Sequence, residues 1–212
     1  LYNFYRYKML AYKEWYNLFQ NGKLNEVQSQ FFKPRTPEAL YNIEEDPHET
    51  KNLANDDNYN ETLTGLRNEL NNHLISINDL SFLPEPHLLQ NGLNDIVDYS
   101  EKNKDLIKSL IEISDLMLYD YNEVSFQIKD ALNNDNPWVR YWGLIVSSTF
   151  GDLALENNEK INFIFENDSE NLVRMRAAEF MLLNNIEISD SKINSLLVRS
   201  NFEAEANLML NT

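Results

Sequence analysis

The sequence predicts a mostly α-helical protein, with a small α+β part at its N-terminus followed by an α-solenoid of helix pairs. Three observations support this fold class. Apolar residues recur at spacings of three and four along most of the chain, which is the period of a helix. One short segment near residue 40 has the alternation of a strand. A pattern in the second half recurs after 34 residues, a period typical of stacked helix pairs.

The composition allows a packed core and restricts the partners. The chain has 212 residues, of which 42% are hydrophobic, enough for one large domain or two small ones. Acidic residues outnumber basic ones by 34 to 18, which gives a net charge of −16. A field of this sign argues against binding to nucleic acid or to an anionic membrane surface. A polyanionic sugar would be repelled as well, unless a local basic cleft receives it.

The absence of cysteine excludes three kinds of site within these residues. A disulfide scaffold, a thiolate metal site and a cysteine nucleophile all require a residue that the chain lacks. No run of about 18 apolar residues is present, so we predict no membrane span. The sequence begins at Leu1 and ends at Thr212 inside an apolar run, and we expect both ends to be internal to a longer protein.

The first 33 residues predict two helices. The first helix has an aromatic face and ends at Asn21-Gly22, where glycine can take the left-handed conformation. A second, short helix ends before Pro34. The face of the first helix comprises Tyr5, Met9, Tyr12, Tyr16 and Phe19.

The segment LYNIEEDPHETKNLA, residues 40–54, predicts a strand followed by a capped helical turn. Residues 40–43 alternate as a short strand would. Asp46 is placed to accept hydrogen bonds from a helix start, with Pro47 at the first helical position. Glu49 follows Asp46 at capping-box spacing, and we expect the turn to stop near Asn52.

A longer amphipathic helix follows, capped by Asp56 or Asp57. Pro84 and Pro86 prevent its continuation. We expect its apolar stripe to pack on a sheet or on another helix. That stripe comprises Tyr59, Leu63, Leu66, Leu70, Leu74 and Ile77.

Beyond these prolines the chain is predicted to be wholly helical, and we divide it into domains 1–86 and 87–212. Asn136 caps one helix, with Pro137 at its first position and Gly151 past its end. Two other apolar stripes are formed by Leu106, Leu110, Ile113 and Met117, and by Val124, Ile128 and Ala131.

The repeat rests on two similar segments. NPWVRYWGL, residues 136–144, resembles ENLVRMRAA, residues 170–178, at an offset of 34. The tail 204–211 echoes residues 177–184 more loosely. The helical half therefore resembles HEAT-like repeats.

Arg140 and Arg174 occupy equivalent positions of this repeat. The resemblance to HEAT-like repeats implies that such an arginine pairs with an acid of the neighbouring repeat. Asp135 and Asp168 are the predicted partners.

Residues 40–54 also resemble the C-terminal signature of the sulfatases, with Asn42 in place of the usual Asp. Residues 22–42 and 79–86 are similar to the bacterial branch related to heparan N-sulfatases, so the resemblance covers about residues 1–90. The matching signature residues are Leu40, Tyr41, Asp46, Pro47, Glu49, Asn52, Leu53 and Ala54.

This resemblance implies that the chain is the rear part of a sulfatase, without its reaction centre. Sulfatases use a formylglycine, made in a Cys/Ser-x-Pro-x-Arg motif, and a calcium ion, and both belong to a domain that these residues do not include. No such motif occurs in the sequence. No catalytic, cofactor-binding or metal-ligating residue is therefore assigned, and the chain alone is expected to be inactive. The signature strand would close a small antiparallel sheet on which the following helix packs.

The implied parent protein is a hydrolase that removes sulfate, as an O-sulfate ester or an N-sulfate, from a sugar or glycan. Its N-terminal catalytic domain would be the main partner of these residues, which would give structural support and wall the substrate cleft. The resemblance implies a periplasmic or secreted location. The alternative is a HEAT-like module that binds a protein, a glycan or a second copy of itself, with no catalysis.

The three histidines are poor metal ligands, because none stands four residues from another. We expect His48 to be exposed and His73 to lie on the polar side of its helix. His87 follows a proline-rich loop that could reach the active site of the parent protein. The acidic run at residues 56–58 lacks the glycine that a calcium loop of the EF-hand type requires, so capping is the better account.

Trp138 and Trp142 share one helix face. They could form a sugar-stacking platform or a partner anchor. We expect instead that they pack in the core between helices, because large aromatic residues usually do.

Overall fold

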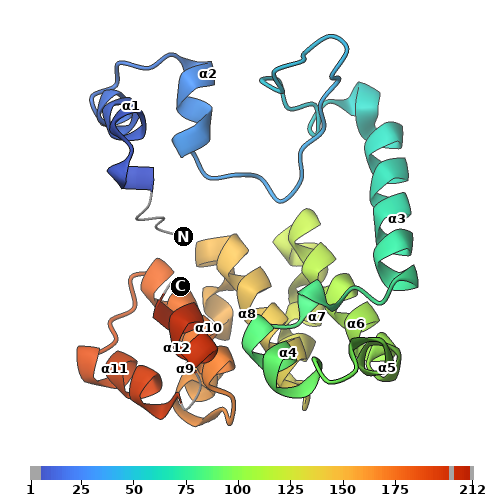
Figure 1. Ribbon diagram of the computed structural model, residues 1–212, viewed down its shortest axis with the longest axis vertical. Coiled ribbons are helices and arrows are strands. Elements are labelled where there is room, and N and C mark those ends of the chain that lie inside the picture. Colours follow the sequence, from blue (N-terminus) through green and yellow to red (C-terminus); the bar gives the residue numbers. More distant parts are fainter. Residues whose placement is uncertain (1–5, 201–202, 211–212) are drawn as a thin grey trace. The chain divides into compact units, whose positions relative to one another are not determined.

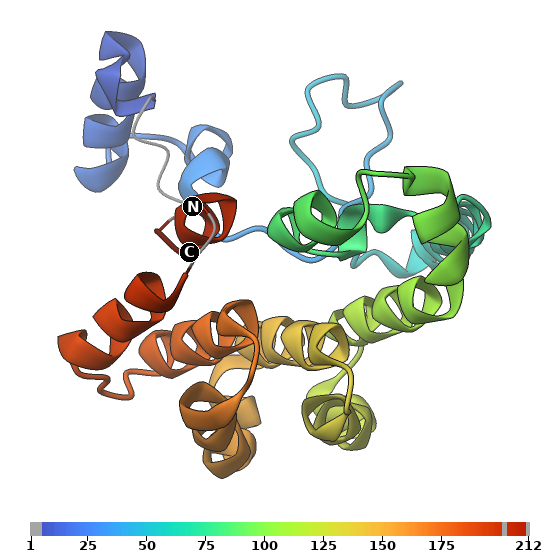
Figure 2. The ribbon, with the colours of Figure 1, turned by 60° about the horizontal axis from the view of Figure 1, so that its bottom comes forward.

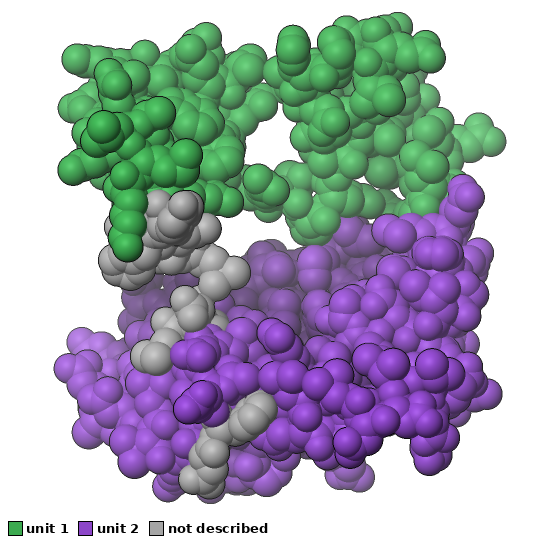
Figure 3. All heavy atoms as spheres, viewed as in Figure 1, with its two compact units in different colours: residues 1–67 green, residues 68–212 purple. Residues whose placement is uncertain are grey.

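The computed structural model describes residues 6–200 and 203–210. The chain divides into two compact units, residues 1–67 and residues 68–212, shown in separate colours in Figure 3. The sequence placed a domain limit at 86/87 instead. Leu83 is 3% exposed and belongs to the core of the second unit. The second compact unit therefore begins before the predicted end of the sulfatase-like part. The limit at 86/87 stays a prediction.

The first unit has short helices joined by long loops. Gly22 has a φ of +64°, as predicted for the end of the first helix. The limit between the units falls within the third helix. The elements are η1 (Arg6–Lys8), α1 (Leu10–Gln20), α2 (Glu26–Ser29), η2 (Gln30–Phe32), η3 (Asp57–Tyr59) and α3 (Asn60–Ser76), and the helices α1 to α3 are labelled in Figure 1.

Helix α1 packs against the 3-10 helix η2 through aromatic rings. The ring centroids of Trp15 and Phe32 lie 4.7 Å apart, and those of Phe19 and Phe32 are at the same separation. Tyr12 and Tyr16 join this cluster, which confirms the aromatic face for these members. Met9 is exposed, and Tyr5 lies outside the described residues.

The predicted strand is wrong. Residues 40–43 form no strand, and none occurs elsewhere in residues 6–200 or 203–210. A strand needs a neighbour that bonds its N–H and C=O groups, and here Leu40 bonds to the loop at Asn52 and Leu53 instead. The α+β part of the predicted fold class is therefore replaced by helices and loops.

The second unit is helical, as predicted. Figure 2 shows α8 and α10 side by side, and each also packs against the helix before it, α7 and α9. A description as a HEAT-like solenoid stays a prediction. The elements are η4 (Leu80–Phe82), α4 (Glu85–Asn91), α5 (Ile96–Lys102), α6 (Lys104–Ser114), η5 (Asp115–Leu118), α7 (Tyr121–Asn133), α8 (Pro137–Phe150), η6 (Gly151–Asn157), α9 (Asn158–Asn167), α10 (Asn171–Leu183), α11 (Asp190–Arg199) and α12 (Glu203–Leu210).

The central helix α8 follows its sequence signals. The side chain of Asn136 accepts a hydrogen bond from the N–H of Trp138, and Pro137 is the first helical residue. Gly151, with a φ of +52°, comes directly after the last. A Cβ at Gly143 would stand 3.1 Å from the Cβ of Ala131, so glycine allows α7 and α8 to approach closely. No helix of the described residues is long and apolar enough to cross a membrane.

Candidate functional site

The segment with the sulfatase-like signature is a loop organised by Asp46. One carboxylate oxygen accepts hydrogen bonds from the backbone N–H groups of Thr50, at 2.6 Å, and Lys51, at 2.7 Å. The other accepts the Thr50 hydroxyl at 3.0 Å. The N–H of Lys51, more than any other group, holds the pKa of Asp46 below its ordinary value. This carboxylate therefore ties the loop together in its charged form.

The capped helical turn predicted here is wrong. Asp46 accepts from residues four and five positions later, rather than two or three as in a helix cap. Glu49 has a φ of +52°, which is outside the helical region and turns the chain sharply. The predicted capping box between Asp46 and Glu49 therefore does not form.

The two ends of the signature segment are joined by hydrogen bonds. The N–H of Leu53 donates to the carbonyl oxygen of Leu40 at 2.7 Å. The side-chain oxygen of Asn52 accepts from the N–H groups of Leu40, at 2.9 Å, and Ala54, at 3.0 Å. Four signature residues thus have structural roles in closing the loop.

The acidic run that follows acts as a helix cap, as predicted. Asp56 accepts hydrogen bonds from the backbone and the side-chain nitrogen of Asn58, at 3.0 and 2.8 Å, just before α3. No cluster of three or more metal-ligating His, Cys, Asp or Glu side chains occurs within the described part of the chain.

Unit 1 contains an open pocket of about 640 Å³, here called the loop pocket. Residues 30–41 form one side and residues 49–52 the other. The Nε2 of Gln30 donates to the carbonyl oxygen of Thr50 at 2.8 Å and joins the two sides. Lys33 and Arg35 line this pocket, and sequence reasoning did not single them out. The signal was available: two bases separated by a proline, in a strongly acidic chain.

Of the three histidines, His87 is the one that packs against aromatic side chains of the described residues. His48 and His73 are exposed, as predicted. The Nε2 of His87 lies 2.7 Å from the Tyr99 hydroxyl, and its ring centroid lies 4.5 Å from that of Trp138. Burial lowers the pKa of His87 from its ordinary value of 6.5 and raises that of Tyr99. These contacts fix α4 on the core, and a role in the active site of a parent protein stays the less favoured alternative.

The two tryptophans of α8 pack in the core, as expected. Trp138 is 5% exposed. The indole N–H of Trp142 donates to the carbonyl oxygen of Phe82 at 2.7 Å, and the two rings lie 5.5 Å apart. Neither side chain forms an open sugar platform.

The predicted pairing of Arg140 is confirmed. Its Nε and Nη2 donate to the two carboxylate oxygens of Asp168, at 2.7 and 2.9 Å. Its Nη1 donates to the backbone carbonyl oxygens of Asn134 and Asp135, at 2.8 and 2.9 Å. The side chain of Asp168 is 3% exposed. Asp135 therefore contributes its backbone and not its carboxylate.

The same prediction is wrong for Arg174. Its Nε donates to the carbonyl oxygen of Phe165 at 2.7 Å, at the end of α9. In this helix the pairing with a carboxylate is made by Arg176, whose Nη1 lies 2.6 Å from Glu179. The sequence echo aligned the positions correctly, but the two arginines meet different surroundings.

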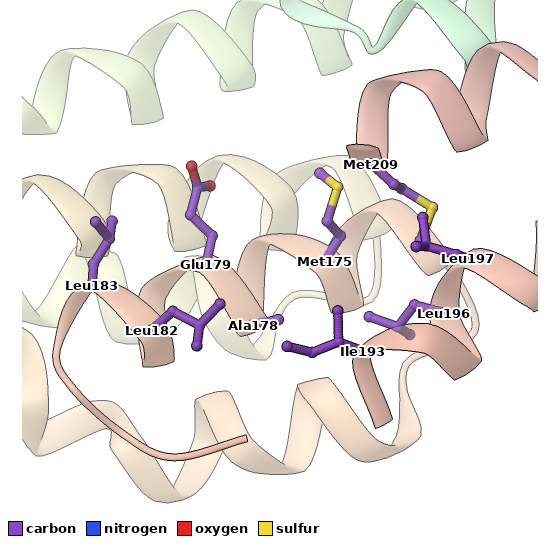
Figure 4. Close-up of a pocket in the computed structure, with 9 residues that line it drawn as sticks. All are labelled: Met175, Ala178, Glu179, Leu182, Leu183, Ile193, Leu196, Leu197 and Met209. Carbon is purple, nitrogen blue, oxygen red and sulfur yellow. The ribbon is translucent and has the colours of Figure 1, made fainter. Parts of the chain in front are cut away.

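The last three helices enclose an apolar pocket of about 240 Å³ (Figure 4). Among the described residues that line it, Glu179 is the one ionisable side chain, and it is paired with Arg176. Such a pocket can hold an apolar group but offers no pair of groups for acid–base chemistry. Its lining consists of Met175, Ala178, Glu179, Leu182, Leu183, Ile193, Leu196, Leu197 and Met209.

Comparison with known proteins shows that the chain contains a region related to a sulfatase. The relative is the "Ulvan-active sulfatase" of Formosa agariphila, which is 42% identical over 94 residues. The match covers 42% of this chain and 16% of that protein, so the chain spans a small part of the relative's length. No protein-family profile matches the chain, and no solved structure matches it. The narrower assignment to the heparan N-sulfatase branch stays a prediction.

Proposed function

We propose that residues 1–86 form the C-terminal support of a sulfatase and pack against its catalytic domain. The parent protein would remove sulfate from a sulfated sugar, and the relative's name makes ulvan the first substrate to test. Formylglycine and calcium would belong to that catalytic domain. The chain alone would be inactive, and the parent protein would work in the periplasm or outside the cell.

The observation that carries this proposal is the thin core of unit 1. Within residues 6–67, Leu53 alone is a buried apolar side chain, at 6% exposed. Large apolar side chains that would normally form a core are open, including Leu10 at 85% and Ile43 at 66%. A unit of this size needs apolar burial for stability, and contiguous exposed apolar surface marks an interface.

The apolar stripe of α3 supports the same conclusion. The sequence predicted that it packs on another element, yet Leu66, Leu70 and Ile77 are 51%, 55% and 53% exposed. Covering three such side chains would contribute several kcal/mol, at about 25 cal/mol per Å² of apolar surface buried. Tyr59, Leu63 and Leu74 of the same stripe are half-buried, so the face is partly covered, and a catalytic domain that packs on α3 would cover the rest.

An assay of sulfate release tests the proposal directly. The 212-residue chain and the longer natural polypeptide that contains it would each be incubated with ulvan oligosaccharides, and free sulfate would be measured. We expect release by the longer polypeptide and none by the chain. Release by the chain itself, or a longer polypeptide without a Cys/Ser-x-Pro-x-Arg motif, would overturn the proposal.

A second candidate function is a binding module formed by the helical unit. The apolar pocket between α10, α11 and α12 favours it, because Leu182 and Leu183 at its rim are 52% and 64% exposed. Such a surface could receive a partner protein or a second copy of the chain. Light scattering after size exclusion would detect self-association. A monomer that gains no partner when mixed with the catalytic domain would remove the support for this candidate.

A further inference from the structure

The negative charge of the protein is unevenly divided between its two units. Residues 1–67 hold 8 of the 18 basic and 10 of the 34 acidic residues, so unit 1 is close to neutral. The remaining residues, 68–212, carry nearly the whole net charge. Most of the negative charge that would repel a polyanionic sugar therefore belongs to residues 68–212, and the composition of unit 1 permits a local anion site.

Basic side chains gather at the loop pocket without carboxylate partners. Lys33 and Arg35 line it, and neither forms an ion pair within the described residues. The guanidinium of Arg6 lies 5.4 Å from the ring centroid of Phe31, another lining residue. Unpaired cations that converge on one concave surface are the usual means of binding an oxyanion.

The acids of the pocket leave a small positive excess. Glu38 is bound by Arg67, whose Nε donates to it at 3.1 Å, and its charge is neutralised. Glu49 is exposed and is the other acidic residue of the lining. Two bases therefore oppose one unneutralised carboxylate. This balance leaves the pocket with a small net positive charge, which favours an anion such as a sulfate monoester.

The rest of the lining suits a sugar ring. Phe31 is 37% exposed and Tyr41 is half-buried, so both offer ring surface beside the cations. Pro34 and Pro37 fix the backbone on either side of Arg35. Pockets that combine apolar ring surface with a few placed polar groups are typical of small-molecule sites.

We propose that the loop pocket binds the sulfate group of a sulfated sugar, with Lys33 and Arg35 as the anion-binding residues. Phe31 and Tyr41 would pack against the sugar ring. This inference rests on the proposed function, because a support that walls the substrate cleft of a sulfatase would meet sulfated sugar outside the reaction centre.

Titration of the isotope-labelled 212-residue chain, followed by amide NMR shifts, tests the proposal. The probes are glucose 6-sulfate, glucose and inorganic sulfate, at matched ionic strength. We expect glucose 6-sulfate to bind most tightly and to shift the amides of Lys33, Arg35, Thr36, Glu38 and residues 50–52. The double variant K33Q/R35Q should bind it at least about tenfold more weakly, because two charge-assisted contacts are lost.

A second double variant, K13Q/K23Q, is the matched control. It removes the same charge from exposed positions outside the pocket, so its affinity should equal that of the unaltered chain. Equal weakening in both double variants would overturn the proposal, since it would show a general field effect. Tighter binding of inorganic sulfate, or equal binding of glucose, would also overturn it.

The two proposals fail in different ways. Absence of binding to both the isolated chain and the longer polypeptide, with sulfate release by the longer polypeptide, would remove the sugar subsite and leave the support function. Binding at the loop pocket, without release by the longer polypeptide, would leave the subsite and remove the sulfatase.

Discussion

Replacement of Arg140 by alanine should strongly destabilise the helical unit. The change removes both hydrogen bonds to Asp168, whose carboxylate is 3% exposed, and two bonds to backbone carbonyl oxygens. Breaking a buried ion pair from one side costs about 3–5 kcal/mol, because the other charge stays buried without a partner. Arg140 keeps 14% of its side chain exposed, which places the loss near the lower end.

Thermal unfolding followed by circular dichroism measures this loss. A loss of about 3 kcal/mol corresponds to a fall in Tm of roughly 6–12 °C for a chain of this size. The matched control is Lys102→Ala, which breaks the exposed pair with Asp98 and should lower the Tm far less, because water screens an exposed pair. The double variant R140M/D168L should recover much of the stability, because it leaves no buried charge unpaired.

Equal Tm values for Arg140→Ala and Lys102→Ala would refute this reasoning. They would mean that the pair between α8 and the end of α9 contributes no more than a surface contact. A double variant less stable than Arg140→Ala would contradict the account of an unpaired buried charge.

Three further results follow from the contacts. Asp46→Asn should speed hydrogen exchange at the N–H of Lys51, which donates to the Asp46 carboxylate. Because the pKa of Asp46 is lowered in the folded chain, the stability that its carboxylate provides is lost as pH falls through that pKa. Gly143→Val should destabilise α8 by about 1–3 kcal/mol in denaturant unfolding, because a Cβ there meets Ala131 at 3.1 Å. His87 should titrate below 6.5 by NMR, so folding stability should decline as pH falls below 6.5, where the unfolded chain binds the proton first.

Each of these has a contradicting result. Unchanged exchange at Lys51 would show that Asp46 does not hold the loop. A stable Gly143→Val variant would mean that α7 and α8 separate at little cost. A pKa of His87 at or above 6.5 would contradict the burial of its ring.

Local signals in the sequence predicted the limits of α8 correctly. Asn136 and Gly151 bound α8 because caps and left-handed turns are made by neighbouring residues. The partner of Arg140 was one of the two predicted acids, Asp135 and Asp168, because the resemblance to HEAT-like repeats implies an acid of the neighbouring repeat. The prediction of a strand at residues 40–43 was wrong because alternation shows only that a strand is possible. A strand forms where another segment hydrogen-bonds to its edge.

The loop pocket could not be predicted from pattern. It is assembled by the contact of Gln30 with Thr50, which are 20 positions apart with no periodic segment between them. Arg174 shows a related limit. Its position in the repeat was correct, but its partner, the carbonyl oxygen of Phe165, leaves no mark in the sequence.

Chemical labelling of the α3 stripe most directly tests the central claim, which is that α3 packs against a catalytic domain. The chain has no cysteine, so Leu70→Cys and, on the opposite face of α3, Asn72→Cys each introduce one thiol that can react with a maleimide. In the isolated chain both should react quickly, since both positions are exposed. In the longer natural polypeptide, corrected for the reaction of its unaltered form, Leu70→Cys should be protected while Asn72→Cys reacts as before. Equal reaction at both positions would contradict packing of α3 against a catalytic domain.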